Sequence, residues 1–190
     1  VEIDISSVND QPKAIGISIA TSEDTIKSGS LSGVDVENLA LTFFVSQAPL
    51  KGTVTINADG SYVYTPFKDA NGTDSFSFNV GDGELSSAAA PVSVFIAAIN
   101  DLPVSISGNL NTDQDLTVNG KLNATDVDGD AIIYSTVVLP TKGTVTNLNA
   151  ATGTYTYVPN AGAVGADSFT FRARDNTDFS NIATITIDLK

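Results

Sequence analysis

The residues in this chain most able to do chemistry are acidic side chains that occur in short clusters. Asp126, Asp128 and Asp130 alternate with Val127 and Gly129, so their carboxylates can face one side of an extended loop. Several oxygen ligands around one ion, carboxylates among them, are what calcium requires. The cluster is therefore a candidate calcium site. The alternative is that these residues only form turns, which Asp also favours for backbone reasons.

The composition restricts what other chemistry the chain can do. There is no His and no Cys, which removes Ser-His and Cys-His nucleophilic catalysis and the usual zinc ligands. The net charge of −13 argues against nucleic acid and anionic membrane surfaces as partners, because both attract basic patches. The sequence holds no apolar run long enough to span a membrane. We expect no enzyme activity, no membrane insertion, and binding of divalent cations.

Two copies of one module make up the chain. Asn9–Pro12 returns as Asn100–Pro103, 91 residues later, and a fixed period of this kind indicates a tandem array. Further repeated pairs are Lys51–Thr55 with Lys142–Thr146, Tyr62–Pro66 with Tyr155–Pro159, and Gly72–Phe78 with Gly165–Phe171. We expect residues 9–99 and 100–190 to form one domain each. Residues 1–8 are expected to be a linker or the last strand of a preceding module.

Short alternating runs of Thr, Val, Ile, Tyr and Phe, broken by Gly, Asp, Asn and Pro, predict β-strands throughout. Seven strands per module fit an immunoglobulin-like sandwich, so the expected fold is all-β, with two tandem seven-stranded sandwiches. The expected strands lie near 13–20, 25–31, 39–46, 52–57, 61–65, 74–80 and 88–98, and near 103–108, 115–121, 131–138, 143–148, 154–158, 167–174 and 182–189. The core should contain Phe76, Phe78, Phe169 and Phe171.

These strands must position the acidic loops. When seven strands run up and down, the first, third and fifth loops lie at the end where the chain leaves a module, and the other loops lie where it enters. Acidic residues of both modules are therefore expected at the junction. The predicted ligands are Glu23, Asp24, Asp74, Asn100, Asp101, Asp126, Asp128 and Asp130. Asp74 has a plain alternative, the capping of loop amides, and Asp69, Asp175 and Asp178 are left open between ligand and solvated charge.

The entrance end of module 1 carries a reduced version of the same acidic pattern. Asp35 and Glu37 align with Asp126 and Asp128, whereas Leu39 stands where module 2 has its third carboxylate. A site there would have fewer charged ligands. We therefore predict that any ion favours the junction over the upstream end.

The order of acidic turn, Asp-x-Asp-x-Asp loop, Lys-Gly-Thr-Val-Thr, Tyr-x-Tyr, Gly-Thr-Asp-Ser-Phe and Asn-Asp-x-Pro resembles the cadherin-like tandem repeats of large bacterial surface adhesins. The resemblance implies an extracellular or cell-surface stalk segment, with neighbouring repeats as partners and often with calcium at the junctions. One alternative is a module that binds glycans or other adhesins through Tyr62, Tyr64, Tyr155 and Tyr157. Another is a set of accessory domains of a secreted enzyme.

Overall fold

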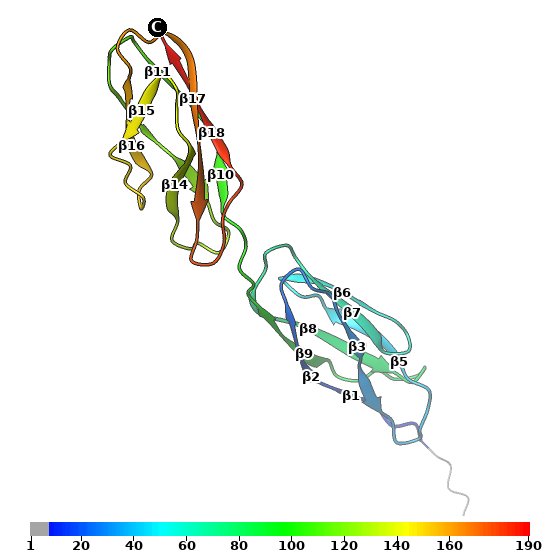
Figure 1. The fold of residues 1–190 in the computed structure, drawn as a ribbon. Helices are drawn as coiled ribbons and strands as arrows, with labels where there is room; N and C mark the ends of the chain where they lie inside the picture. Colours follow the sequence, from blue (N-terminus) through cyan, green and yellow to red (C-terminus); the bar gives the residue numbers. More distant parts are fainter. Residues whose placement is uncertain (1–7) are drawn as a thin grey trace, which may run out of the picture. The chain divides into compact units, whose positions relative to one another are not determined.

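The computed structural model describes residues 8–190, and it folds them into β-strands and loops (Figure 1). The chain divides into unit 1, which ends at Ile99, and unit 2, Asn100–Lys190. Two tandem all-β sandwiches are confirmed. Among the described residues, no helix is long and apolar enough to cross a membrane. The run at residues 1–7, predicted to be a linker or a preceding strand, lies outside the described part.

Unit 1 is a sandwich of two main sheets. A four-stranded sheet has the order β2-β9-β8-β5, a three-stranded sheet has the order β3-β7-β6, and β1 pairs with β4. The strands are β1 (Lys13–Ile15), β2 (Ile17–Ser22), β3 (Lys27–Ser30), β4 (Ser32–Val34), β5 (Thr42–Gln47), β6 (Gly52–Ile56), β7 (Ser61–Pro66), β8 (Gly72–Gly81) and β9 (Ala90–Ala97).

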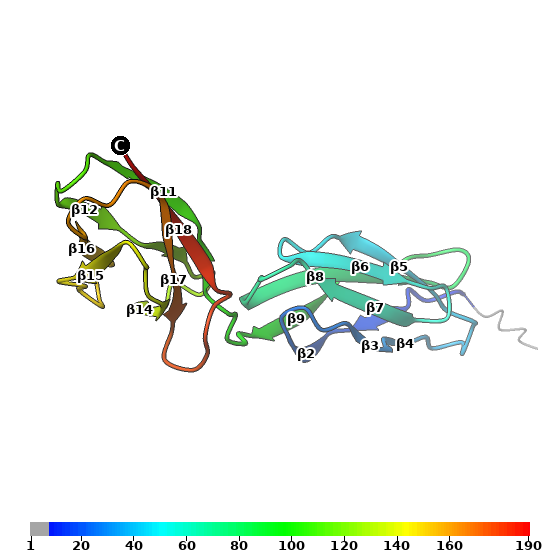
Figure 2. The same ribbon diagram turned by 45° about the horizontal axis from the view of Figure 1, so that its top comes forward.

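Unit 2 repeats this topology with its own strands. The four-stranded sheet has the order β11-β18-β17-β14 and the three-stranded sheet the order β12-β16-β15, and these strands are labelled in Figure 2. β10 pairs with β13. The strands are β10 (Val104–Ile106), β11 (Gly108–Thr112), β12 (Val118–Lys121), β13 (Asn123–Thr125), β14 (Ile133–Val138), β15 (Gly143–Thr146), β16 (Thr154–Pro159), β17 (Gly165–Arg174) and β18 (Ala183–Leu189).

Within residues 8–190 the strands of each unit exceed the expected seven, because the first two expected strands are each interrupted. β1 pairs antiparallel with β4, whereas β2, beyond Gly16, pairs parallel with β9, so the first segment changes sheet. A Cβ at Gly16 would lie 2.7 Å from the carbonyl oxygen of Pro91. β3 and β4 separate at buried Leu31, whose amide donates to the carbonyl of Gly60 at 2.8 Å.

The predicted aromatic residues do form the cores. Phe76 and Phe78 are 1% and 0% exposed in unit 1, and burying each ring contributes roughly 1.5–3 kcal/mol. Tyr64 is 0% exposed as well, and in both units the tyrosines of the Tyr-x-Tyr motif are buried in the same way. The glycan-binding or protein-binding face suggested for Tyr62, Tyr64, Tyr155 and Tyr157 is therefore wrong, because these rings pack inside the sandwiches.

Two of the repeated motifs pack directly against each other. A Cβ at Gly143, in the Lys-Gly-Thr motif, would lie 2.4 Å from Cζ of Tyr157, in the Tyr-x-Tyr motif. At Gly52 it would lie 2.8 Å from Cζ of Tyr64. Each glycine thus makes room for a buried tyrosine ring, which gives both motifs a structural reason to recur together.

Candidate metal site

The end at which the chain enters unit 2 is held by two hydrogen bonds to acidic loops. Asn100 Nδ2 donates to Oδ2 of Asp175 at 3.0 Å, in the loop between β17 and β18. The amide of Asp101 donates to Oδ2 of Asp128 at 2.7 Å, in the loop between β13 and β14. Within unit 2 the structure therefore brings the Asn-Asp-x-Pro motif together with the second and sixth expected loops.

The Asp-x-Asp-x-Asp loop concentrates negative charge at this end of unit 2. Asp126, Asp128 and Asp130 each place one carboxylate oxygen within 4.8 Å of the others. The amide of Asp130 donates to Oδ1 of Asp126 at 3.2 Å, and Gly129 has a φ of 78° that lets the loop turn. Like charges this close repel each other, and a cation among them would remove that cost.

One buried oxygen of this loop fits a cation directly. Oδ2 of Asp126 is buried and accepts no hydrogen bond within the described residues. A buried carboxylate oxygen without a donor costs free energy, and a hard divalent cation such as calcium takes carboxylate oxygens as its ligands and would remove that cost. The donor set of this loop therefore fits the predicted metal.

Asp175 organises the site although the sequence left its role open. It is 2% exposed. Its Oδ1 accepts the amides of Thr177 and Asp178, and its Oδ2 accepts Asn100. The amide of Asp178, then the side chain of Asn100, hold the pKa of Asp175 below its ordinary value. The sequence signal that could have revealed this role is the repeat: Asp82 stands 93 residues earlier, directly after the corresponding strand of unit 1.

The entrance end of unit 1 has the same construction. Asn9 Nδ2 donates to Oδ2 of Asp82 at 3.0 Å, and the amide of Asp10 donates to Oε2 of Glu37 at 3.2 Å. These contacts correspond one for one to those of unit 2. The acidic residues at the upstream end therefore lie together around the Asn-Asp-x-Pro motif, as they do in unit 2.

Asp35 forms a further contact that matches unit 2, but the loop it begins has one carboxylate fewer. Its Oδ1 accepts the amide of Leu39 at 2.9 Å, as Asp126 accepts that of Asp130. Oδ2 of Asp35 and Oδ1 of Asn9 are buried without a hydrogen-bond partner among the described residues. Leu39 occupies the position of the third carboxylate, so this end of unit 1 has less charge for a cation.

At the opposite, exit end of unit 1 lie Glu23 and Asp24, from the first loop. Glu23 is 2% exposed, its Oε1 accepts the amide of Ile99, and its Oε2 is buried without a hydrogen-bond partner in the described part. Oδ1 of Asp24 accepts the amide of Asp69, in the fifth loop, at 3.3 Å. The first and fifth loops therefore meet, as the counting of strands predicts.

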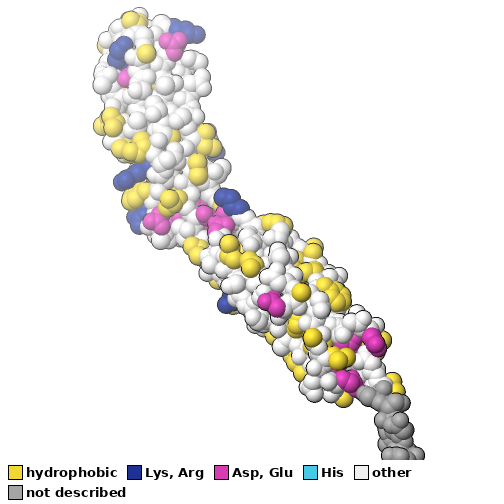
Figure 3. Space-filling view, turned by 90° about the vertical axis from the view of Figure 1, so that its right-hand side faces the viewer, with side chains coloured by type: hydrophobic (Ala, Val, Ile, Leu, Met, Phe, Trp, Pro, Cys, Tyr) yellow, Lys and Arg dark blue, Asp and Glu magenta, His cyan; other side chains and the backbone are white. Residues whose placement is uncertain are grey.

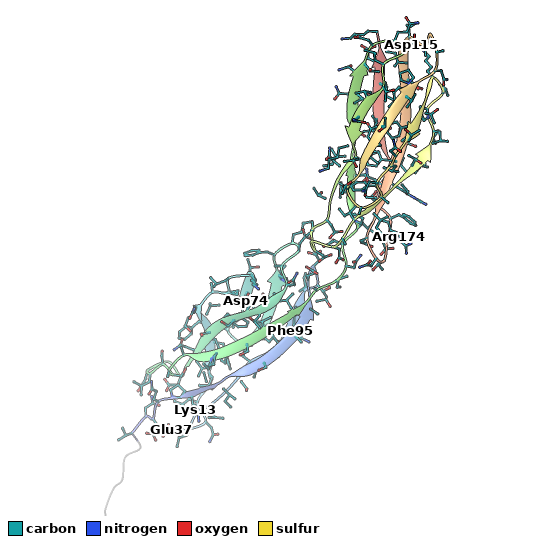
Figure 4. All side chains as sticks on the ribbon, turned by 90° about the vertical axis from the view of Figure 1, so that its left-hand side faces the viewer. Lys13, Glu37, Asp74, Phe95, Asp115 and Arg174 are labelled. Carbon is teal, nitrogen blue, oxygen red and sulfur yellow. The ribbon has the colours of Figure 1, made fainter. Side chains whose placement is uncertain are left out.

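Asp74 is not among the described acidic groups whose carboxylate oxygens lie within 4.8 Å of one another. Its Oδ1 accepts the amides of Leu50 and Ser75, and its Oδ2 accepts the amide of Lys51 and, at 2.7 Å, the hydroxyl of Tyr64. Both oxygens are thus occupied by protein donors, which favours the alternative of a capping residue. Figure 4 shows Asp74 and Glu37 at separate places in unit 1.

The electrostatics of Asp74 agree with a structural role. Burial alone would raise its pKa, but hydrogen bonds from the Tyr64 hydroxyl and from three amides outweigh burial and hold the pKa below its ordinary value. Burial, and then the bond to Asp74, raise the pKa of Tyr64. Asp167 and Tyr157 form the same pair in unit 2, also at 2.7 Å.

The chain is thus a tandem pair of β-sandwiches whose ends carry buried carboxylates that are incompletely hydrogen-bonded within the described residues. In the face shown in Figure 3, the acidic side chains gather in a few small groups on a mostly uncharged surface. Two consecutive matches to the bacterial cadherin-like domain family cover residues 9–98 and 100–190. The chain belongs to this family.

Individual proteins and solved structures are similar to this chain at low sequence identity. Integrin beta-like protein A of Dictyostelium discoideum is 25% identical over 98% of this chain, which spans 11% of that protein. Repeats EC21–23 of human CDH23 match with a TM-score of 0.65 and 17% identity, over 95% of this chain and 70% of that one. An endo-fucoidan hydrolase from glycoside hydrolase family 107 matches with a TM-score of 0.43 and 22% identity, over 95% of this chain and 29% of that one.

Proposed function

We propose that this chain is a structural segment of an extracellular or cell-surface adhesion protein, in which calcium stiffens the connection between the two units. Family membership supports the role in adhesion. A catalytic role is not proposed, because without His and Cys the chain lacks the usual bases and nucleophile pairs. The partners are neighbouring repeats and, through the parent protein, other surface adhesins or glycans.

One observation carries the proposal for calcium. The amide of Ile99, at the end of unit 1, is bound by Glu23, and the amide of Asp101, at the start of unit 2, is bound by Asp128. These two amides are separated by a single residue of the chain. Each side of the short linker is therefore held by a carboxylate of its own unit, and within residues 8–190 Glu23 and Asp126 each keep a buried oxygen without a hydrogen-bond donor.

Six carboxylates and one amide side chain would supply oxygen ligands from the linker and its flanking loops. We assign Glu23, Asp24, Asn100, Asp101, Asp126, Asp128 and Asp130 to this set, and we leave out Asp74 because its oxygens accept protein donors. The cation would neutralise the clustered charges and cross-link the linker to the loops. At an ion concentration about 100 times the dissociation constant, the added stability is about 2.7 kcal/mol.

Calcium titration of two matched variants tests the proposal. Asp128→Ala removes a charged ligand, whereas Asp59→Ala removes the same group from a hairpin turn of unit 1, where Asp59 accepts the amide and hydroxyl of Ser61. We expect calcium to raise the thermal midpoint of the wild type and of Asp59→Ala, and to raise that of Asp128→Ala much less. Small-angle scattering should show a narrower distribution of shapes in calcium than in chelator. Coincident scattering profiles, with equal calcium shifts in both variants, would refute the calcium link.

A further inference from the structure

The only two arginines of the chain lie side by side around one aromatic ring in unit 2. Arg172 and Arg174 flank Ala173 on β17. Since Ala173 is buried, both arginines lie on the outer face of the four-stranded sheet. Their Cζ atoms lie 3.6 Å and 5.2 Å from the ring centroid of Phe179, and Phe179 is 43% exposed. Figure 4 labels Arg174 at one end of unit 2 and Asp115 at the other.

Within the described residues neither guanidinium forms an ion pair with a carboxylate, in a chain with 22 acidic residues, although the charge of Arg174 helps to lower the pKa of the adjacent Asp175. Within residues 8–190 the one ion pair is Lys68–Asp69, in unit 1. Nε of Arg172 is buried without a hydrogen-bond partner in that range, and the guanidinium lies over the Phe179 ring. Asp175 follows Arg174, but its oxygens accept hydrogen bonds from Asn100 and from the amides of its own loop.

The fold does not require these residues, since unit 1 closes the same loop without them. The equivalent positions in unit 1, 93 residues earlier, are Asn79, Gly81 and Ser86. There the antiparallel backbone β-bridge between Gly81 and Ser86 corresponds to the one between Arg174 and Phe179. The Asn79 side chain donates to the carbonyl of Ser87 at 2.6 Å. The arginines and the exposed ring are thus additions to unit 2 that the sandwich itself does not need.

Hydroxyl groups continue from the arginines along the same sheet face. Ser135 pairs with Arg172 across β14 and β17, and Thr170 pairs with Thr184 across β17 and β18. Further along, Ser168 pairs with Thr186. Both border a hollow of about 440 Å³ that Val138 and Leu139 also line. Four residues of a strand, from Arg172 to Ser168, cover about 13 Å.

We propose that this face of unit 2 binds an acidic polysaccharide. A planar guanidinium pairs with a carboxylate through two parallel hydrogen bonds, so the arginines would take the carboxylate of a uronic acid. The side-chain hydroxyls along β17 and β18 would form hydrogen bonds with the hydroxyls of the adjoining sugars. An acidic peptide fits less well, because β17 and β18 are paired on both sides and offer no free backbone edge for strand addition.

Titration of the whole chain with trigalacturonic acid tests this inference independently of the calcium link. By calorimetry, Arg172→Gln and Arg174→Gln should each weaken binding roughly tenfold or more, because each removes charge-assisted hydrogen bonds. Lys121→Gln is the matched control, since it removes the same charge from β12 on the other sheet. This control should bind like the wild type, and a neutral galactose trisaccharide should not bind.

Three further readouts keep the result interpretable. The Nε–H resonances of the wild-type arginines should shift during the titration, and this measurement does not depend on whether a variant folds. Binding should persist in chelator, because the arginines need no metal. The inference is overturned by binding that disappears in chelator, by arginine resonances that stay fixed, or by equal binding of a glutamate-rich peptide.

Discussion

Asn100 and Asp175 lie 75 residues apart in the chain and are joined by a hydrogen bond of 3.0 Å from the side-chain amide to Oδ2. Asn9 and Asp82 form the same bond at 3.0 Å in unit 1. In each unit this bond fastens the first residues of the module to the loop that precedes its last strand. The Asn of the Asn-Asp-x-Pro motif therefore closes one end of the sandwich by a contact that needs no metal.

Asn100→Ala should destabilise unit 2 without any metal present. The substitution removes a donor from Asp175, which is 2% exposed, and leaving a buried charged group less satisfied costs about 1–3 kcal/mol. Urea unfolding in chelator measures the change. Asn176→Ala is the control, because Asn176 is exposed in the same loop, and it should unfold with the wild type. Identical midpoints for both variants would contradict this role.

The two entrance ends should differ in calcium affinity through one position. Leu39→Asp supplies the third carboxylate that unit 1 lacks, and Asp130→Leu removes it from unit 2. Affinity for calcium depends on the number of charged ligands, so we expect Leu39→Asp to tighten a weak site and Asp130→Leu to weaken a stronger one, each by on the order of tenfold. Calorimetric titration resolves the two classes of site. Unchanged affinities in both variants would mean that this position does not contribute a ligand.

The pairs formed by Tyr64 with Asp74 and by Tyr157 with Asp167 should stabilise their units measurably. Tyr64→Phe keeps the buried ring and removes only the hydrogen bond of 2.7 Å to the carboxylate, which should cost about 1–3 kcal/mol. Tyr62→Phe is the matched control, since its ring is equally buried and its hydroxyl has no hydrogen bond to the described residues. Urea unfolding should show a larger loss in the free energy of unfolding for Tyr64→Phe than for Tyr62→Phe. Equal losses would mean that the effect comes from the surroundings of the ring and not from the hydrogen bond.

Acid should destabilise both units through the same carboxylates. The folded pKa values of Asp74 and Asp167 lie below the ordinary value, so their contribution is fully present above the unfolded pKa of about 3.9. It is lost as the pH falls through the folded pKa. Thermal midpoints in chelator should therefore drop steeply below about pH 4. The decline should be shallower in the Asp74→Asn, Asp167→Asn double variant, and parallel curves would contradict this assignment.

The sequence was sufficient to predict the fold because its signals are periodic. The 91-residue repeat and the alternating strands predicted two sandwiches, and counting strands placed Asp24 beside the fifth loop, where it binds the amide of Asp69. The interruptions at Gly16 and Leu31 were not predicted, because they depend on which sheet each half-strand joins. Pairing of that kind is decided by contacts between residues distant in the chain.

The site was predicted less completely because an Asp in a loop has several possible partners. The pattern around Asp74 does not show that Tyr64, ten residues earlier, donates to its carboxylate from a neighbouring strand. The sequence left Asp175 open between ligand and solvated charge, whereas in the structure it is buried and accepts hydrogen bonds from the amides of Thr177 and Asp178 in its own loop. In both cases the direction of the side chain decides its role. Counting strands predicts only at which end of the sandwich a loop lies, and not where its side chains point.

The parallel pairing of the first and last strands has a mechanical consequence. In unit 1, β2 and β9 run side by side over six residue pairs from Ile17–Val92 to Ser22–Ala97, and β11 and β18 pair in the same way in unit 2. A force that pulls on the two ends of a unit drags these strands past each other along their length. The whole ladder of hydrogen bonds then has to break at once, and not one bond after another. Tension along the polypeptide is thus carried in shear by the strand pair that joins the two ends of each sandwich.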